Sequence, residues 1–340
     1  MNILVVIPIK YLVLEDDFEF DFDGYKLTNN LEAKKELIEL KGFKEHFGIL
    51  HCTHILQSPI LYFKGETSNL HLPEEADSLY KIASLISNNV PRMIDCLWFI
   101  RDNSCSVSLE YYHCFDNNEF SLNDPNSSCC DHIGNYTSTT FNVEEFHICR
   151  GIYRKIADLL YMEAIYPPAL DESKVFNTVP NPLKSLPYNF NRIAIGLNFL
   201  LYARRDSSVI VKITSFVAVL ESLFSTKSGT PYSWKVPKKA ASYVAEDDEN
   251  TAFAYFHFLR EAYGIRSDYI HGNTVNIPRS RLEYISRQVD AITRYSFIKA
   301  LATDTDIFMP EQRERFGNHF ATMVEKFKHV FPPEPEKKCK

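Results

Sequence analysis

The sequence predicts an α+β N-terminal domain followed by an all-α domain, and three observations support this. Strand-like alternation of apolar and polar residues is confined to the first half of the chain. Helical periodicity dominates everything after residue 188, and prolines gather between the two parts. With 45% hydrophobic and 24% charged residues among 340, the composition is that of a globular protein long enough for two domains.

The first half mixes strands and helices. Ile3 to Val13 is rich in Ile and Val, and Phe18 to Phe22 alternates aromatic with acidic residues at the period of a half-buried strand. Further strands are expected on both sides of Ser58-Pro59 within 47–63, and in 105–115, which a polar loop over 116–135 follows. Helical spacing predicts helices at 31–40, 74–86 and 144–164. We therefore expect an α+β domain over residues 1–165, suited to sensing a trigger or choosing substrates.

The second half is separated from the first by a proline-rich stretch. Five of the chain's 17 prolines fall between residues 166 and 187, so a linker is predicted there. Beyond it the chain reads as a helical domain over 188–331, ending in a charged, proline-rich tail, 332–340, that is predicted to be disordered. Six amphipathic helices are expected, at 189–204, 209–224, 237–245, 251–262, 279–301 and 310–331.

Charge is distributed unevenly between the two halves. Residues 1–185 carry 15 basic against 27 acidic residues, a net −12, whereas residues 186–340 carry 22 against 17, a net +5. A polyanion such as RNA is therefore expected to bind the second half, where a set of basic residues could follow its backbone. The members of this basic set are Arg204, Arg205, Lys235, Lys238, Lys239, Arg279, Arg281 and Arg287. The alternative is that these residues form an ordinary solvated surface.

Cysteine usage and hydropathy indicate a cytoplasmic protein. The eight cysteines lack the dense spacing of a secreted disulfide scaffold, and no apolar stretch approaches the eighteen or so residues of a membrane span. The apolar run Ile3 to Ile9 is expected to be a strand rather than a leader. Cys129-Cys-Asp-His132, with His147 and Cys149, lacks the paired knuckles of a zinc site. We therefore expect no metal, no cofactor and no membrane partner.

The segment that carries chemistry lies between Arg266 and His271. On one continuous helix these two residues would point about 140° apart, because successive residues turn by about 100°. Gly264 precedes them and Gly272 follows, and glycine commonly ends or bends a helix. The segment is therefore expected to run through a helix end, where a second copy of the chain could also complete the site.

Arginine and histidine suit the cleavage of RNA. A histidine can take a proton from a ribose 2′-OH or give one to the leaving 5′-oxygen, and an arginine can bind the phosphate. Because the 2′-OH is the nucleophile, such a site cuts RNA and leaves DNA intact. An Arg followed closely by a His occurs again at Arg313 and His319, on a mostly charged helix, and we interpret that second occurrence as a coincidence.

The first pair lies within a longer motif, Tyr263-Gly-Ile-Arg-Ser-Asp-Tyr-Ile-His-Gly272, and an earlier helix precedes it, Phe216-Val-Ala-Val-Leu-Glu-Ser-Leu-Phe224. Together they resemble the Apea-like branch of the HEPN superfamily, whose pattern Leu220, Glu221 and Phe224 match in the earlier helix. The similarity covers about 188–301, with weaker echoes in 91–115. It implies an antiparallel HEPN-like helical bundle that dimerises and acts as a metal-independent endoribonuclease, often a bacterial toxin or antiviral (phage) defence effector.

The resemblance also implies roles for individual residues. By position, Arg266 would contact the phosphate, His271 would be the acid and base, and Glu221 would orient one of them, with Asp268 completing the catalytic set. Ser267 stands where many active members carry Asn, Asp or His. Ser267 and Tyr269 are taken, with Lys238 and Lys239, as the substrate-binding set.

Two alternatives stay open. Arg266 and His271 could form an ion-pair network with Asp268 or Glu221 in a bundle that binds without cutting, as a dimerisation or RNA-binding module that regulates a partner enzyme. The other alternative is that the chain is itself an antitoxin-type partner that regulates a neighbouring enzyme. If the chain is the toxin, an antitoxin or a defence-system protein could be its partner. A Gly-rich phosphate loop, paired catalytic carboxylates and a nucleophile elbow are all missing from the sequence, so ATPase, glycosidase and serine hydrolase functions have no support.

Overall fold

The chain divides into two compact units. The computed structural model describes residues 1–70, 77–125, 128–164, 191–226, 232–309 and 312–333. The first unit comprises Met1–Asp131 and Tyr136–Leu186, and the second comprises His132–Asn135 and Pro187–Lys340. The predicted linker, 166–187, and residues 334–340 of the predicted tail lie outside the described residues.

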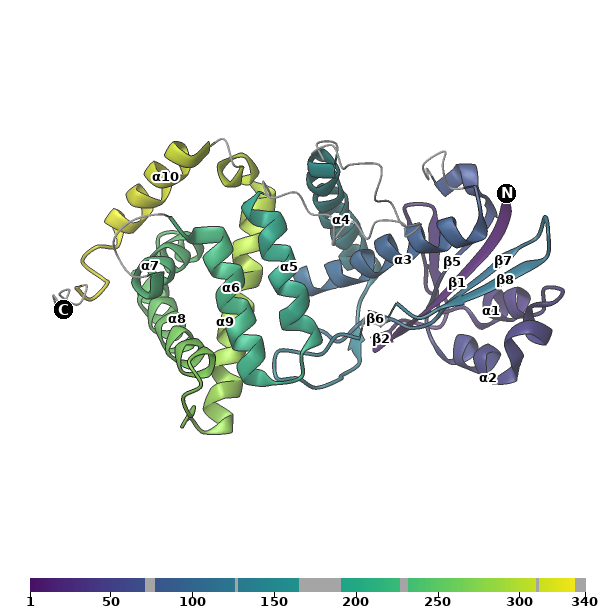
Figure 1. Ribbon diagram of the computed structural model, residues 1–340, viewed down its shortest axis with the longest axis horizontal. Helices are drawn as coiled ribbons and strands as arrows, with labels where there is room; N and C mark the ends of the chain where they lie inside the picture. The colour runs from purple at the N-terminus through teal and green to yellow at the C-terminus, as the bar shows by residue number, and fades with distance from the viewer. Residues whose placement is uncertain (71–76, 126–127, 165–190, 227–231, 310–311, 334–340) are drawn as a thin grey trace, which may run out of the picture. The chain divides into compact units, whose positions relative to one another are not determined.

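The first unit is built on a seven-stranded antiparallel sheet (Figure 1). The path of six strands across it runs β3 (Glu19–Phe22), β4 (Tyr25–Thr28), β5 (Ile60–Glu66), β1 (Asn2–Lys10), β7 (Glu110–Cys114) and β8 (Glu119–Asn123). The seventh strand, β6 (Ser106–Val107), pairs with the end of β1. A separate parallel pair joins β2 (Leu12–Val13) to β9 (Thr139–Thr140). The predicted α+β class is therefore confirmed for this part of the chain.

Helices cover both faces of this sheet. On β7, the Tyr111 ring packs against Phe43 and Phe47 of α2 (Phe43–Gln57). The Tyr112 hydroxyl donates to the Ala83 carbonyl of α3 (Leu79–Asp95) on the opposite face. Because successive side chains of a strand point to opposite faces, a strand covered on both sides is apolar throughout, as the seven buried residues of β1 are. The helices of this unit are α1 (Leu31–Ile38), α2 (Phe43–Gln57), α3 (Leu79–Asp95) and α4 (Val143–Ala164).

Two expectations for the first unit are wrong. The first of the two strands expected within 47–63 is instead the helix α2, which bends at Gly48, where φ is 82°. Its apolar residues, such as Phe47 and Ile55, are buried against the sheet, and this packing outweighs the strand preference of its β-branched residues. The polar loop expected over 116–135 contains the edge strand β8, which pairs with β7.

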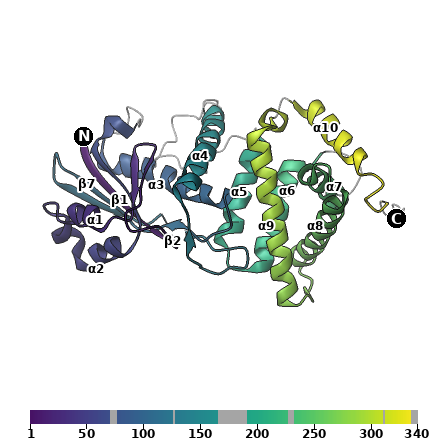
Figure 2. The ribbon, with the colours of Figure 1, turned by 180° about the vertical axis from the view of Figure 1, so that it is seen from behind.

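The second unit is all helical in its described residues, as predicted. Its elements are α5 (Arg192–Arg205), α6 (Val209–Phe224), α7 (Tyr232–Ala245), α8 (Glu249–Ile270), α9 (Arg279–Ala302), a 3₁₀ turn (Thr305–Phe308) and α10 (Arg313–Lys326). The bounds of α6 agree with the sequence prediction. Helix α6 contacts α5, α7, α8 and α9, so it occupies the centre of the unit. Figure 2, which views the molecule from behind, shows that α9 packs on the face of α6 that is turned away from the viewer in Figure 1. Its central position explains why it carries so many large apolar residues.

Helix α8 is longer than predicted. It continues for eight residues beyond the expected end at Ala262, through Gly264, and stops at Ile270. Gly264 neither ends nor bends it, because a single glycine costs only about 1 kcal/mol in a helix interior. Neighbouring Tyr263 and Ile265 are both buried, and their packing holds the helix together at this point.

Four residues from the first half of the sequence belong to the second unit. The Ser286 hydroxyl of α9 donates to the His132 carbonyl, and the Arg287 Nε lies 3.2 Å from the His132 Nε2. Gly134 has φ of 87°, and a Cβ added there would lie 2.0 Å from the Ser207 carbonyl oxygen. Only glycine can lie this close to the Ser207 carbonyl, so the segment His132–Asn135 packs in a defined position against the helices of the second unit.

No helix within the described ranges combines the length and the apolar character needed to cross a bilayer.

Candidate functional site

The end of α8 has the geometry of a Schellman cap. The Gly272 N–H donates to the Tyr269 carbonyl, and the Asn273 N–H donates to the Asp268 carbonyl at 2.8 Å. Gly272 takes the left-handed conformation, with φ of 73°, that this cap requires. His271 is the last residue before that turn, so the Arg266 to His271 segment does run through a helix end, as expected, although only the second glycine contributes.

Arg266 pairs with Glu221 across two helices. The Arg266 Nη2 on α8 donates to the Glu221 Oε2 on α6 at 3.0 Å. The arginine side chain is 30% exposed and the glutamate side chain 23%, so the pair lies at the boundary between core and solvent. Burial raises the pKa of Glu221, and the neighbouring Arg266 charge opposes that shift. The expected role of Glu221 in orienting the arginine therefore has a physical contact behind it.

Tyr263 lies one turn before Arg266 on α8 and is almost fully buried, at 5% exposure. Burial, and next the charge of Glu221, raise the pKa of the Tyr263 phenol well above its ordinary range, so the hydroxyl stays protonated. The side chain belongs to the core and lies close enough to the Arg266 and Glu221 pair for both charges to act on its pKa. Tyr263 is therefore a core aromatic residue rather than a surface on which bases could stack.

The ion pair opens onto a groove of about 570 Å³ between α5, α6 and the end of α8. Clefts that bind small molecules have volumes of about 300–1,000 Å³, so the groove is large enough to hold a ligand. Its walls are mainly apolar, and small hydroxyl side chains lie along α6. The lining residues are Ile195, Phe199, Tyr202, Thr214, Ser215, Ala218, Glu221, Ser222, Ser225, Tyr232, Arg266 and Ile270. We call this the Arg266 groove.

His271 does not line the Arg266 groove. Its side chain is exposed, and it makes no hydrogen bond or ion pair within the described part of the chain. Ser267 is exposed and Tyr269 is 46% exposed, and neither lines the groove. Asp268 accepts from the Asn273 Nδ2 at 3.4 Å and so belongs to the helix cap. The structure thus joins Arg266 to Glu221 but leaves the other members of the predicted catalytic set outside the groove.

The two lysines of the predicted substrate-binding set lie on α7. The Lys239 Nζ donates to the Phe224 carbonyl at 3.2 Å and to the Thr226 Oγ1 at 2.9 Å. Burial, and then the charges of Arg192 and Lys235, lower the pKa of Lys239 to about 8. The Lys238 Nζ lies 5.7 Å from the centre of the Trp234 ring. These contacts give Lys239 a structural role at the end of α6.

Other members of the basic set are also engaged within the unit. Arg204 is buried, at 2% exposure. Arg281 forms two hydrogen bonds with Glu261, and the Arg279 Nε donates to Glu283 at 2.8 Å. Pairing of this kind reduces the positive field that a nucleic-acid backbone would meet. These arginines therefore offer less positive charge to a nucleic-acid backbone than their number suggests.

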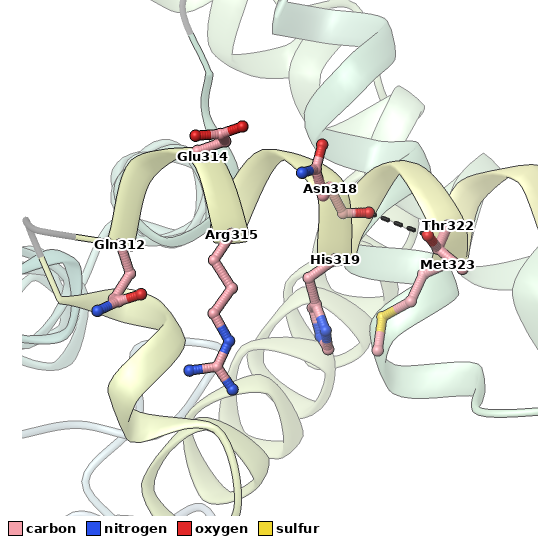
Figure 3. A pocket seen from close by; sticks show the side chains of 7 residues that line it. All are labelled: Gln312, Glu314, Arg315, Asn318, His319, Thr322 and Met323. Carbon is pink, nitrogen blue, oxygen red and sulfur yellow. Dashed lines mark hydrogen bonds between the residues drawn. The ribbon is translucent and has the colours of Figure 1, made fainter.

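A second hollow lies on α10. Figure 3 shows Arg315 and His319 extending to one side of this helix, and the Thr322 hydroxyl donates to the Asn318 carbonyl one turn earlier. All of the lining side chains come from α10 and the residue before it, and Arg315 pairs with Asp306. One helix face without an opposing wall cannot enclose a substrate. The interpretation of the second Arg and His pair as a coincidence stays a prediction, because the Arg313 side chain lies outside the described residues.

Within the described residues, no group of three or more His, Cys, Asp or Glu side chains is arranged to hold a metal ion. Cys129 donates instead to the Asp95 carboxylate. Comparisons with protein families, with curated proteins and with solved structures gave no match to this chain.

The aromatic residues that line the Arg266 groove were not predicted from the sequence. Phe199 and Tyr202 are three residues apart on α5, on a different face from the buried residues Ala194 and Leu200. Their spacing places them side by side on a helix, and aromatic residues outside the buried stripe of an amphipathic helix are a readable signal. The sequence could therefore have indicated an apolar surface on α5, but not that it borders Arg266.

Proposed function

We propose that the second unit is a metal-independent endoribonuclease of HEPN type, an antiparallel bundle that dimerises and serves as a toxin or antiviral defence effector. The observation that carries the proposal is the Arg266 guanidinium, held by Glu221 at the edge of a groove, with the exposed His271 five residues later at the end of the same helix. In a dimer, two such helix ends would supply two guanidinium and two imidazole groups to one cleft.

The proposed reaction uses side chains alone. Arg266 binds the scissile phosphate, and His271 of one protomer accepts the proton of the ribose 2′-OH as that oxygen attacks phosphorus. The bond from phosphorus to the 5′-oxygen breaks, and the leaving oxygen takes a proton from the imidazolium of the other protomer. The products are a 2′,3′-cyclic phosphate and a 5′-hydroxyl. Glu221 holds the guanidinium in place throughout.

A second candidate is a non-catalytic HEPN module for dimerisation or RNA binding that regulates a partner enzyme. The observation that favours it is the same ion pair, because Glu221 partly neutralises the charge that Arg266 would offer to a phosphate. His271 also lacks a neighbouring side chain within the described part of the chain that would fix its tautomer.

Cleavage of RNA in the presence of a chelator separates the two candidates. The full chain would be incubated with total RNA and transfer RNA in EDTA, and the ends of any fragments identified by mass spectrometry. We expect 2′,3′-cyclic phosphate ends, lost in His271→Ala and retained in His257→Ala, which removes another exposed histidine of α8. Intact RNA, or cleavage that His271→Ala leaves unchanged, would contradict the nuclease.

A further inference from the structure

The Arg266 groove combines features that fit an aromatic, negatively charged ligand. Its apolar lining includes three large aromatic side chains that the fold leaves exposed: Phe199 at 37%, Tyr202 at 66% and Tyr232 at 47%. Single exposed aromatic residues are common, but several that share one hollow indicate a surface for binding. The groove thus offers planar faces to a flat ring.

The end of the groove next to Arg266 adds charge and hydrogen-bonding capacity. The guanidinium is partly exposed and keeps donors beyond the one that Glu221 accepts. Along α6, Thr214 and Ser215 line the same hollow, so two small hydroxyl-bearing side chains interrupt its mainly apolar wall.

We infer that the Arg266 groove binds one unpaired nucleobase of a single-stranded RNA, with the adjoining phosphate at Arg266. This rests on the proposed function and specifies its substrate. Base stacking on aromatic side chains is worth about 1–3 kcal/mol per base and tolerates any sequence. The bases of a duplex are stacked on one another and cannot enter a groove between helices. The site therefore selects unpaired RNA, such as loops and bulges.

Tyr202 is the residue that best tests the inference. It is the most exposed of the three aromatic residues, so replacing it does not disturb the core. Tyr295 on α9 is 57% exposed and does not line the groove, which makes it a matched control on the same unit. Tyr202→Phe keeps the ring and should keep the binding.

The experiment measures binding by fluorescence anisotropy with 2′-O-methyl oligonucleotides, which cannot be cut because their nucleophile is blocked. A single strand and a duplex of the same sequence are compared. We expect the single strand to bind the wild-type chain at least tenfold more tightly than the duplex. Tyr202→Ala should lose roughly 5- to 100-fold of that affinity, and Tyr202→Phe and Tyr295→Ala should lose none.

Three results would overturn the inference: equal affinity for duplex and single strand, equal losses in Tyr202→Ala and Tyr295→Ala, or a Tyr202→Ala chain whose oligomeric state changes. The last would mean that a second copy covers the groove. The cleavage assay separates this inference from the proposed function. Uncut RNA with Tyr202-dependent binding contradicts the nuclease alone, whereas normal cleavage with binding indifferent to Tyr202 contradicts the groove alone.

Discussion

Glu221 and Arg266 illustrate how a half-buried ion pair can position a functional group. An exposed arginine samples many rotamers, and each contact that restricts it reduces the entropy lost when a ligand binds. The hydrogen bond to Glu221 fixes the direction of the Arg266 guanidinium while leaving part of it open to the groove. The same bond also reduces the net charge at the site, so orientation is gained at some loss of attraction for an anion.

Glu221 entered the predicted site only through the resemblance to a known family, which did not say whether it would contact Arg266 or His271. The two residues are 45 positions apart, and a single sequence carries no signal that joins a glutamate in one helix to an arginine in another. Asp268 is much closer than Glu221 to Arg266 and His271 in the sequence, yet its side chain binds Asn273 in the cap of α8. Sequence proximity is a poor guide here, because the turn of the helix directs neighbouring side chains to different faces.

Lys239 allows a prediction about pH at the residue scale. Its pKa falls from an ordinary 10.5 to about 8, so between these values the unfolded chain binds more protons than the folded chain does. The stability of the wild type should therefore rise relative to Lys239→Met as the pH increases from 8 to 10, by about 2 kcal/mol. Urea unfolding of both chains at pH 8, 9 and 10 measures this difference.

The matched control for that measurement is Lys238→Met, which removes an equal charge from the same helix. If Lys238→Met and Lys239→Met respond to pH in the same way, the structural role assigned to Lys239 is wrong. Lys239 would then be available to RNA, as the sequence suggested.

At the scale of elements, helical periodicity was the most informative signal. It placed α6 at its observed bounds because that helix is amphipathic in composition and flanked by Ser208 and Ser225. It failed for α2, where Ile and Thr residues favour a strand and Pro59 interrupts the pattern. The strand pattern, in turn, did not predict β4. Asp23-Gly24 between alternating residues is nevertheless a hairpin signature, and both residues take positive φ in the structure.

Gly272 allows a prediction about the end of α8. An alanine at this left-handed position is strained, although nothing lies within 4 Å of the added methyl group. Gly272→Ala should lower the free energy of unfolding by about 1 kcal/mol. Gly264→Ala is the control on the same helix, because it also has open space and a helical backbone, and it should raise stability by about 0.5–1 kcal/mol.

Thermal unfolding of the two glycine variants beside the wild type measures both effects. The opposite signs follow from backbone conformation alone. A stable Gly272→Ala chain would mean that the cap is not formed in solution, and His271 would then have no fixed place at the helix end.

At the scale of the whole molecule, the proposed nuclease requires two chains for one cleft. Wild-type and His271→Ala chains, with different affinity tags, would be expressed together and the mixed dimers purified. Each mixed dimer keeps one imidazole where the proposed reaction uses two, so it should cleave RNA about tenfold or more slowly than the wild-type dimer. A mixed dimer with half of the wild-type activity would show that the cleft is not shared.

The chain enters the second unit twice, and this affects how the protein can be divided into fragments. The chain enters that unit at His132, leaves it after Asn135 and returns at Pro187, so three peptide bonds join the units. A fragment starting at residue 187 would lack the carbonyl that Ser286 binds and the glycine that fits against Ser207. If a protease cut the chain within the proline-rich stretch, the N-terminal fragment would still contain His132–Asn135, which belongs to the helical unit. The two fragments should therefore stay associated through this segment.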